Sequence, residues 1–373
     1  YLDLYTILLY TPFLYANIFG EEKKMAEWTP ESLAASVTEY ARLLGACSVG
    51  IATRQMLEGG PPSTDLTYVL SEAESAVSFA VPLNQSFIGP YLAKEDRLSH
   101  EKDNIRVNAE ASGIACALEN FLEHHGYKSK AIKVNEVYRQ EVERGKYAMM
   151  PDISLRYLAA RSGAGFLGLS GNILTKKEGA AVILGAVVTE AKLTPTEPIP
   201  PEENYCDRCG LCLNSCLSGM MDKENETTVI LGDIPFIYAK RREYMRCEFV
   251  CGGMSGLHPT KKWSTWSPGR FHIPEKDEDF YELMRKGVKA YYKRPDMGGG
   301  TYHILMKKKL YLTCGNCQLL CHPDKKIRLE RFKTLTQNGV IIQRPDGSLE
   351  RVTPERAEEH ITAMNAETQA LYQ

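Results

Sequence analysis

Seven of the eleven cysteines of this chain fall into two short runs whose spacing is suited to binding metal clusters. They are Cys206, Cys209, Cys212 and Cys216 in the pattern C-x2-C-x2-C-x3-C, and Cys314, Cys317 and Cys321 in the pattern C-x2-C-x3-C. Such spacing is more typical of thiolate ligands for iron–sulfur clusters than of disulfides. Because each 4Fe-4S cluster takes four thiolates, two clusters need one more ligand than the two runs supply.

The missing thiolate is expected between the two runs, where the chain has only Cys247 and Cys251. We assign Cys247 and keep Cys251 as the alternative. In two-cluster ferredoxins the fourth cysteine of such a run ligates the other cluster. One cluster is therefore predicted to bind Cys206, Cys209, Cys212 and Cys321, and the other Cys216, Cys247, Cys314 and Cys317.

Two other uses of paired cysteines fit this pattern less well. A zinc ribbon is built from two C-x2-C pairs, not from a triple followed by a fourth cysteine at x3. Disulfides are disfavoured by the tight spacing and by the lack of a convincing secretory signal. The remaining cysteines, Cys47 and Cys116, lie in apolar stretches and are predicted to be small core residues.

Length and composition predict a globular protein with one large or two medium domains. The chain has 373 residues, 43% of them hydrophobic, and a formal net charge of −2. This charge balance gives no general argument for a nucleic-acid or membrane partner. We therefore expect a cytoplasmic protein and do not expect nucleic acid as its partner.

The N-terminal segment 1–24 is apolar and aromatic, but Asp3 and Pro12 interrupt it and no basic region precedes it. A membrane-spanning helix needs about 20 mainly apolar residues. Met25 would be a natural start. We interpret 1–24 as an extension, with a membrane anchor as the alternative.

The elements that must position the cysteines follow from hydrophobic periodicity and turn residues. Helices are predicted over 30–44, 103–125 and 152–161, and strands over 47–52, 77–81, 129–134 and 180–189. This alternation predicts an α+β protein that begins with an α/β sandwich over 25–193.

The composition changes after Leu193. A Pro- and Glu-rich linker leads into a predicted ferredoxin-like domain for two clusters, 194–330, in which strand signals nearly vanish until residue 340. A hairpin of 340–343 and 349–352, followed by a helix, completes the C-terminal region 331–373.

The sequence around the first cysteine run resembles a known family. The Gly-rich segment 158–168, the apolar segment 184–189 and the cysteine run follow one another as in epoxyqueuosine reductases and respiratory reductive dehalogenases. Arg246-Cys247 resembles the isolated ligand cysteine of these families, and 313–321 resembles their closing motif. The resemblance covers roughly residues 152–324.

The resemblance implies a cobalamin. In both families a base-off corrinoid lies between a nitroreductase-like α/β domain and the cluster domain, and the clusters deliver electrons to its cobalt. Glycines let a backbone approach a flat ligand closely. By the resemblance, the residues at the corrinoid are Gly163, Gly165, Gly168, Gly171 and Asn172. A plain strand-to-helix turn is the other interpretation of these glycines.

Catalytic residues are less clearly matched. The catalytic aspartate of epoxyqueuosine reductases has no clear counterpart around 133–136, and their tRNA-contacting C-terminal extension is not evident. A small molecule is therefore favoured over tRNA as substrate.

Reductive dehalogenases use a tyrosine with a basic neighbour as proton donor, since a cation stabilises the phenolate. Tyr147 beside Lys146 is our first choice and Tyr138 beside Arg139 the second, with a charged helix face as the alternative.

Two tryptophans three residues apart, Trp263 and Trp266, have two interpretations. They could form the wall of a site for a flat ligand. They could equally belong to a packed loop that shields a cluster from water.

Together these features predict an oxidoreductase for a small-molecule substrate. Electrons would pass from reduced ferredoxin or flavodoxin through two 4Fe-4S clusters to cobalamin, which performs the redox step. The alternative is an electron-transfer or corrinoid-activating protein without substrate chemistry of its own.

Overall fold

The computed structural model describes residues 28–295 and 312–372, apart from 133, 135, 136, 144 and 204. It describes the backbone of Lys146 and Tyr147 but not their side chains. The predicted extension 1–24 and the side chains of the predicted proton-donor pair Tyr147–Lys146 are therefore not described, and both stay predictions.

Helix α2 (Pro30–Leu43) forms where the sequence predicts a helix. The Thr29 side chain accepts a hydrogen bond from the backbone N–H of Ser32, and the Ser32 side chain accepts one from the backbone N–H of Thr29. This reciprocal cap satisfies donors that the first turn of a helix leaves unpaired. The helix stops just before Gly45, whose φ of 110° favours glycine.

The central sheet has four strands, and each neighbouring pair is antiparallel. Their order is β1 (Ser48–Thr53), β2 (Ser75–Pro82), β6 (Val182–Thr189) and β3 (Ser129–Ile132). The two inner strands, β2 and β6, are buried along nearly their whole length. The mixed α/β class predicted from the sequence is confirmed.

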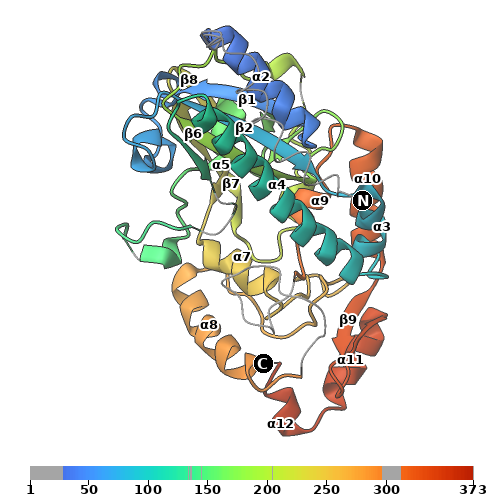
Figure 1. Cartoon of the computed structure of the whole chain (residues 1–373). Coiled ribbons are helices and arrows are strands. Elements are labelled where there is room, and N and C mark those ends of the chain that lie inside the picture. The colour runs from blue at the N-terminus through green and yellow to red at the C-terminus, as the bar shows by residue number, and fades with distance from the viewer. Residues whose placement is uncertain are drawn as a thin grey trace, which may run out of the picture.

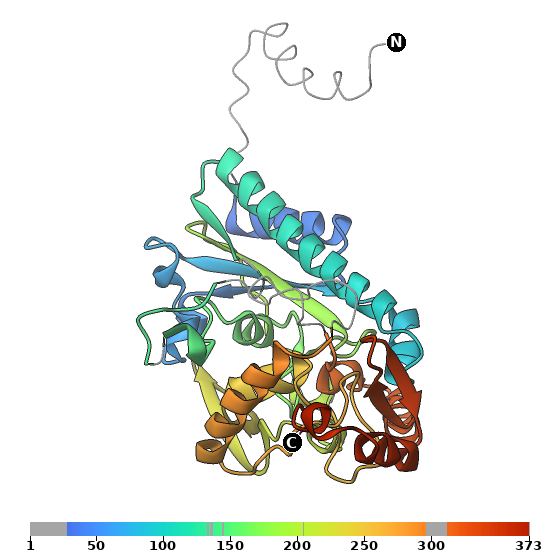
Figure 2. The ribbon, with the colours of Figure 1, turned by 90° about the horizontal axis from the view of Figure 1, so that it is seen from below.

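Both faces of this sheet carry a hydrophobic core, because successive strand residues point to opposite faces. Val77 and Phe79 pack with α2 and with α4 (Leu98–His124), whereas Ala76 packs with Leu158 of α5 (Leu155–Arg161). Figure 2 shows the resulting layers, with α2 and α4 over one face and α5 under the other.

Helix α4 begins at Leu98 rather than at residue 103 as predicted. Asp96 accepts a hydrogen bond from the backbone N–H of Ser99 at 3.1 Å, which holds the first turn in place. Cys116 is exposed on the side of α4 that faces away from the sheet, and Cys47 is exposed just before β1. The prediction that these two cysteines are core residues is therefore wrong, since an apolar neighbourhood in sequence does not decide which helix face a residue occupies.

The prediction that strands nearly vanish between 194 and 340 is also wrong. β7 (Met221–Leu231) and β8 (Ile234–Arg241) form a long antiparallel hairpin. Gly232, with a φ of 64°, and Asp233 form its turn, and such glycine-containing pairs favour hairpins. The hairpin is hard to recognise because the first half of β7 is polar and exposed, whereas Val229 and Leu231 pack against α5.

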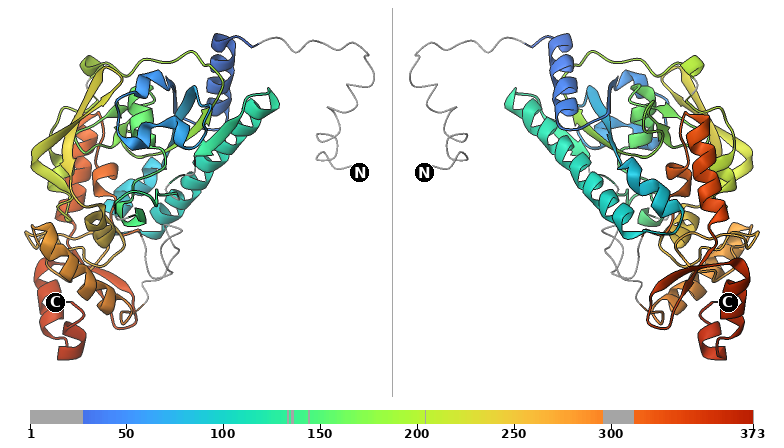
Figure 3. Two further views of the ribbon diagram at one scale, coloured as in Figure 1. Left: turned by 90° about the vertical axis from the view of Figure 1, so that its left-hand side faces the viewer. Right: turned by 90° about the vertical axis from the view of Figure 1, so that its right-hand side faces the viewer.

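Further helices and a C-terminal hairpin follow along the described part of the chain. They are α3 (Gln85–Leu92), α6 (Leu211–Asn214), α7 (Tyr244–Cys251), α8 (Asp277–Tyr291), α9 (Asn316–Leu319), α10 (Lys325–Gln337), β9 (Val340–Gln343), β10 (Leu349–Val352), α11 (Pro354–Thr362) and α12 (Ala366–Gln369). The predicted β9–β10 hairpin is confirmed. Helix α2 lies at one end of the molecule, and α11 and α12 lie at the other (Figure 3). Among the described helices, none combines the length and apolar character that a bilayer crossing requires.

One hydrophobic core joins the sheet to the C-terminal half of the chain. In the ribbon, α10 of that half lies beside α3 (Figure 1). Trp263, Trp266 and Leu335 are buried in the same cluster as the helices over the sheet. The Trp266 indole N–H donates to the carbonyl of Tyr91 at 2.9 Å, and Trp263 stacks on His258 with ring centroids 4.5 Å apart. The tryptophans thus belong to packed loops, the second of the two interpretations. The predicted domain boundaries stay predictions.

Candidate functional site

The structure brings together the four cysteines assigned to the first cluster, Cys206, Cys209, Cys212 and Cys321. Burial raises the pKa of the Cys212 thiol to about 12, and the nearby thiols of Cys317, Cys206 and Cys209 add to this shift. Burial also raises the pKa of Cys321, with Cys206, Cys212 and Cys209 among the contributing neighbours. We call these four residues the first cysteine group.

The cysteines assigned to the second cluster, Cys216, Cys247, Cys314 and Cys317, form a second cysteine group. Burial raises the pKa of Cys314 to about 12, and its thiol neighbours are Cys317 and Cys216. Cys247 has Cys251, Cys317 and Cys314 as neighbours. Because Cys247 and Cys251 lie one turn apart on α7, both reach this group, and the choice between them stays a prediction.

The chemistry of the donor set suits two clusters. All members of the second group and Cys251 are half-buried. Burial is nevertheless the main cause of the raised pKa of the Cys247, Cys251 and Cys314 thiols. Within the described part of the chain, no three His, Cys, Asp or Glu side chains converge closely enough to hold a single metal ion. The four thiolates of a 4Fe-4S cluster bind four different irons, so they need not converge on one point.

The Gly-rich segment touches both cysteine groups. β4 (Phe166–Leu167) and β5 (Ile173–Leu174) form a tight hairpin whose tip is the Gly-rich turn, residues 168–172. In this turn the backbone N–H of Leu169 donates to the sulfur of Cys206 at 3.3 Å. The side-chain amide of Asn172 donates to the sulfur of Cys317 at 3.6 Å. One turn therefore contacts the first group on one side and the second group on the other.

The glycines of this segment pack against protein atoms. A Cβ on Gly163 would clash with the backbone oxygen of Glu197, and one on Gly165 would clash with the Ile173 side chain. Gly171, with a φ of 72°, faces Arg241. These glycines are explained by close packing, and they present no open backbone face to a flat ligand. The corrinoid contacts of Gly163, Gly165, Gly168, Gly171 and Asn172 thus stay predictions that this packing does not favour.

Two arginines converge on one phenol beside the Gly-rich turn. Arg156 of α5 donates to the Oη atom of Tyr244 at 2.8 Å, and Arg241 at the end of β8 donates to the same atom at 2.9 Å. Arg241 also donates to the carbonyl of Ser170 at 2.7 Å. Two charge-assisted hydrogen bonds hold this phenol oxygen in a fixed position beside the turn.

This trio is not among the site residues predicted from the sequence. Tyr244 lies three residues before Cys247, which is a signal that could have drawn attention to it. Arg156 comes from a helix far away in sequence, and only the packing of α5 against α7 and β8 brings it to Tyr244.

The second predicted proton-donor pair, Tyr138 and Arg139, is divided between two environments. Burial raises the pKa of Tyr138 to about 12, and its charged neighbours are Glu248, Tyr244 and Arg156. Arg139 is buried elsewhere, where it donates to the carbonyls of Pro62 and Asp152 and lies over the Tyr68 ring. Arg139 therefore anchors loops, whereas Tyr138 lies near Tyr244, and the catalytic role of both stays a prediction.

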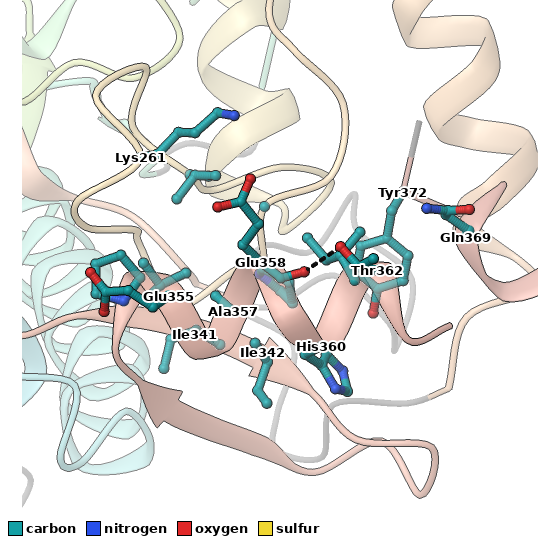
Figure 4. Close-up of a pocket in the computed structure, with 16 residues that line it drawn as sticks. Lys261, Ile341, Ile342, Glu355, Ala357, Glu358, His360, Thr362, Gln369 and Tyr372 are labelled. Atoms are coloured by element: carbon teal, nitrogen blue, oxygen red, sulfur yellow. Dashed lines mark hydrogen bonds between the residues drawn. The ribbon is translucent and has the colours of Figure 1, made fainter. Parts of the chain in front are cut away.

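A cleft of about 380 Å³ lies in the C-terminal region, between α11, β9 and the loop around Gly269 (Figure 4). His360, Ile342 and Tyr372 are among its lining residues. No lining residue belongs to a cysteine group or to the Gly-rich turn. This cleft is therefore separate from the predicted redox site.

Known relatives support the resemblance found in the sequence. No family model matches the chain. An epoxyqueuosine reductase of Atelocyanobacterium thalassa (isolate ALOHA) is 26% identical over 180 residues, which cover 47% of this chain and 52% of the relative. One of Bacillus subtilis (strain 168) is 23% identical over 203 residues, which cover 51% of each. The chain thus spans about half the length of the curated relatives that it matches.

Two of the solved structures that resemble this chain are an epoxyqueuosine reductase and a reductive dehalogenase. A structure of epoxyqueuosine reductase with an epoxyqueuosine-modified tRNA stem loop is 17% identical, with 91% of this chain and 75% of that chain covered and a TM-score of 0.43. The catabolic reductive dehalogenase NpRdhA is 13% identical, with 62% and 30% covered and a TM-score of 0.46. The predicted resemblance to epoxyqueuosine reductases is confirmed by the curated relatives.

Proposed function

We propose that this relative of the epoxyqueuosine reductases is an iron–sulfur oxidoreductase that passes electrons through two 4Fe-4S clusters. The observation that carries this proposal is the contact of one Gly-rich turn with both cysteine groups, through Leu169 to Cys206 and through Asn172 to Cys317. Two groups that share so short a connection are near neighbours, as electron transfer between clusters requires.

Each cysteine group has a distinct role in this proposal. The first cysteine group holds the cluster that receives electrons, and the second group holds the cluster that passes them on. The second group comprises Cys216, Cys314, Cys317 and, by our assignment, Cys247. Tyr244, with its hydrogen bonds from Arg156 and Arg241, lies beside the Gly-rich turn and supplies a proton to the reduction.

The resemblance adds a corrinoid to the proposal. A bound cobalamin would supply the reactive metal centre of a substrate reduction. The close packing of the glycines does not favour their predicted contacts with a corrinoid. The roles proposed here for the cysteines and for Tyr244 therefore do not depend on a bound corrinoid. Our substrate proposal is a small molecule, and a tRNA substrate like that bound by the solved relative is the alternative.

The test of the clusters is the iron content of anaerobically purified, reconstituted protein. We expect about eight irons per chain, and loss of about four in Cys247→Ala. Cys251→Ala is the matched control on the same helix face and should keep both clusters. The reverse result would reassign the ligand, whereas a chain without bound iron would reject the proposal.

A second measurement separates the reductase from a simple electron carrier. We expect reduced protein mixed with cobalamin to show the absorption spectrum of bound, reduced corrinoid. Protein that holds both clusters but binds no cobalamin would support the electron-transfer alternative.

A further inference from the structure

The two arginines that bond to Tyr244 lie on the side of the Gly-rich turn that contacts the second cysteine group. A side-chain nitrogen of Arg241, at the end of β8, lies 3.4 Å from the oxygen of the Asn172 side chain. The nitrogen of the same amide donates to the sulfur of Cys317 at 3.6 Å. One amide group therefore separates the charge of Arg241 from a cysteine sulfur. We call Arg156 and Arg241 the arginine pair.

Arg156 reaches the same region from α5. Its guanidinium donates to the carbonyl of Gly171 at 3.5 Å and to the Oη atom of Tyr244 at 2.8 Å. Tyr244 packs against the same small hydrophobic cluster as three cysteines of the second group. Both members of the arginine pair are thus held within one residue of that group.

The arginine pair has no ion-pair partner in the part of the chain that the structure describes. Both side chains are half-buried, and their hydrogen-bond partners are uncharged oxygens of the Gly-rich turn and of Tyr244. Glu248 follows Cys247 on α7, but among the described contacts it forms no ion pair with either arginine. Because partly buried charge is costly without a counter-charge, an anion is expected close to the pair.

The first cysteine group has a different charge environment. Arg328 of α10 pairs with Asp207, which lies within the first cysteine run. Arg331 of the same helix also lies near the first group, and its neighbours include the acids Glu178 and Glu330. The arginines beside the first group thus come with carboxylates, so we expect little net charge from them.

We propose that the arginine pair is the counter-charge of the second cluster and gives it the higher reduction potential of the two. This inference rests on the proposed function and deepens it, because it gives the electrons a direction. In the step concerned, the first cluster loses one electron and the second cluster gains it, while no bond forms or breaks. The second cluster becomes more negative on reduction, so nearby positive charge stabilises its reduced state.

A purely structural role is the competing explanation, in which the arginine pair only holds the Gly-rich turn and Tyr244 in place. Substitution can separate charge from hydrogen bonding. Glutamine removes the charge but can still donate to carbonyl and phenol oxygens, whereas lysine keeps the charge but loses the fork geometry of the guanidinium. A structural role predicts similar effects of both substitutions, and a counter-charge role predicts a larger effect of glutamine.

A redox titration of the cluster-loaded protein, followed by electron paramagnetic resonance, tests the proposal. In Arg241→Gln and, independently, in Arg156→Gln, the ratio of reduced to oxidised second cluster at a fixed potential should fall about tenfold or more. For a one-electron couple a tenfold change corresponds to about 59 mV. Arg241→Lys and Arg156→Lys should keep most of the parent potential.

The second cluster must be recognised in the titration, and a control is needed for the loss of an arginine. The signal of the second cluster is the one missing from whichever of Cys247→Ala and Cys251→Ala loses about four irons. Arg161→Gln is the matched control on α5, because Arg161 is buried and donates to the carbonyl of Leu231 at 3.3 Å, beside the turn of the β7–β8 hairpin. Both potentials should keep their parent values in this control.

Equal shifts, or equal loss of iron, in the glutamine and lysine variants would overturn the proposal, because they would assign the arginine pair a structural role. So would an unchanged potential of the second cluster in both glutamine variants, or a first cluster that shifts as much as the second. Loss of the second cluster from the glutamine variants alone would support the proposal. Failure of the proposed function is separately visible as a parent protein that binds no iron.

Discussion

The side-chain amide of Asn172 donates a hydrogen bond to the sulfur of Cys317 at 3.6 Å, across 145 residues of sequence. Hydrogen bonds to cluster sulfurs raise the reduction potential, because they stabilise the more negative reduced state. The oxygen of the same amide lies 3.4 Å from a nitrogen of Arg241. Asn172 therefore connects the charged trio of Arg156, Arg241 and Tyr244 to the second cysteine group.

Asn172→Ala should lower the reduction potential of the second cluster. Loss of one weak hydrogen bond of about 0.5–1 kcal/mol corresponds to about 20–40 mV for a one-electron couple. A redox titration followed by electron paramagnetic resonance measures this shift. Asn120→Ala, on the exposed face of α4, is the control and should leave both potentials unchanged. Equal potentials in all three proteins would refute the assigned hydrogen bond.

Tyr244→Phe should slow substrate reduction while leaving both clusters intact. The variant keeps the ring but removes the oxygen that accepts hydrogen bonds from Arg156 and Arg241. Loss of a proton donor typically costs about 100-fold or more in rate. Tyr157→Phe removes a neighbouring phenol that is bonded to Tyr238, so it controls for loss of a buried hydroxyl. Similar rates in both variants would exclude Tyr244 as the donor.

Gly185→Ala should destabilise the central sheet. An added Cβ would collide with the ring of Phe79 on β2, and it would lie 3.3 Å from the carbonyl oxygen of Ala111 on α4. Such overpacking typically costs about 1–3 kcal/mol in the free energy of unfolding. Gly113→Ala is the matched control, because α4 leaves open space there and alanine is favoured in a helix. Urea denaturation should show opposite signs for the two variants.

Lys94 should make stability depend on pH. Burial, aided by the charge of Arg351, lowers the pKa of Lys94 from 10.5 to about 7, and its ammonium group donates to the carbonyl of Leu335 at 3.0 Å. Between pH 7 and 10.5 the unfolded chain binds more protons at this residue than the folded chain, so stability rises with pH across that window.

Lys94→Met removes this titration. The stability of the variant minus that of the parent, measured as free energies of unfolding by urea denaturation, should therefore be larger at pH 7 than at pH 9.5. Lys130→Met, at an exposed position on β3, is the control and should show no such difference. If the difference in stability between Lys94→Met and the parent stayed constant from pH 7 to pH 9.5, the lowered pKa of Lys94 would be contradicted.

Local sequence signals were sufficient for much of the fold. Thr29-Pro30 marks the start of α2, and the apolar runs of β2 and β6 mark the two inner strands. The β7–β8 hairpin was harder to recognise, because its stability comes from Val229 and Leu231 packing on α5 rather than from regular alternation along β7.

The candidate site was predictable only where its residues lie in compact motifs. Short spacings restrict where cysteine side chains can point, and the structure places the cysteines of the two runs near one another, whereas their division into two groups stays a prediction. The trio of Arg156, Arg241 and Tyr244 could not be predicted, because it depends on how α5, β8 and α7 meet. Adjacent residues can also diverge, as Tyr138 and Arg139 do.

The Gly-rich turn has a consequence for the speed of the proposed redox chain. Electron tunnelling rates fall steeply with distance, and the five residues 168–172 contact a cysteine of each group. The backbone hydrogen bond from Gly168 to the carbonyl of Asn172, at 2.9 Å, closes this turn and limits how far its ends can separate. The two proposed redox centres are thereby held together by short stretches of chain, which are this turn and the links from Cys212 to Cys216 and from Cys317 to Cys321, rather than by the movement of one half of the protein against the other.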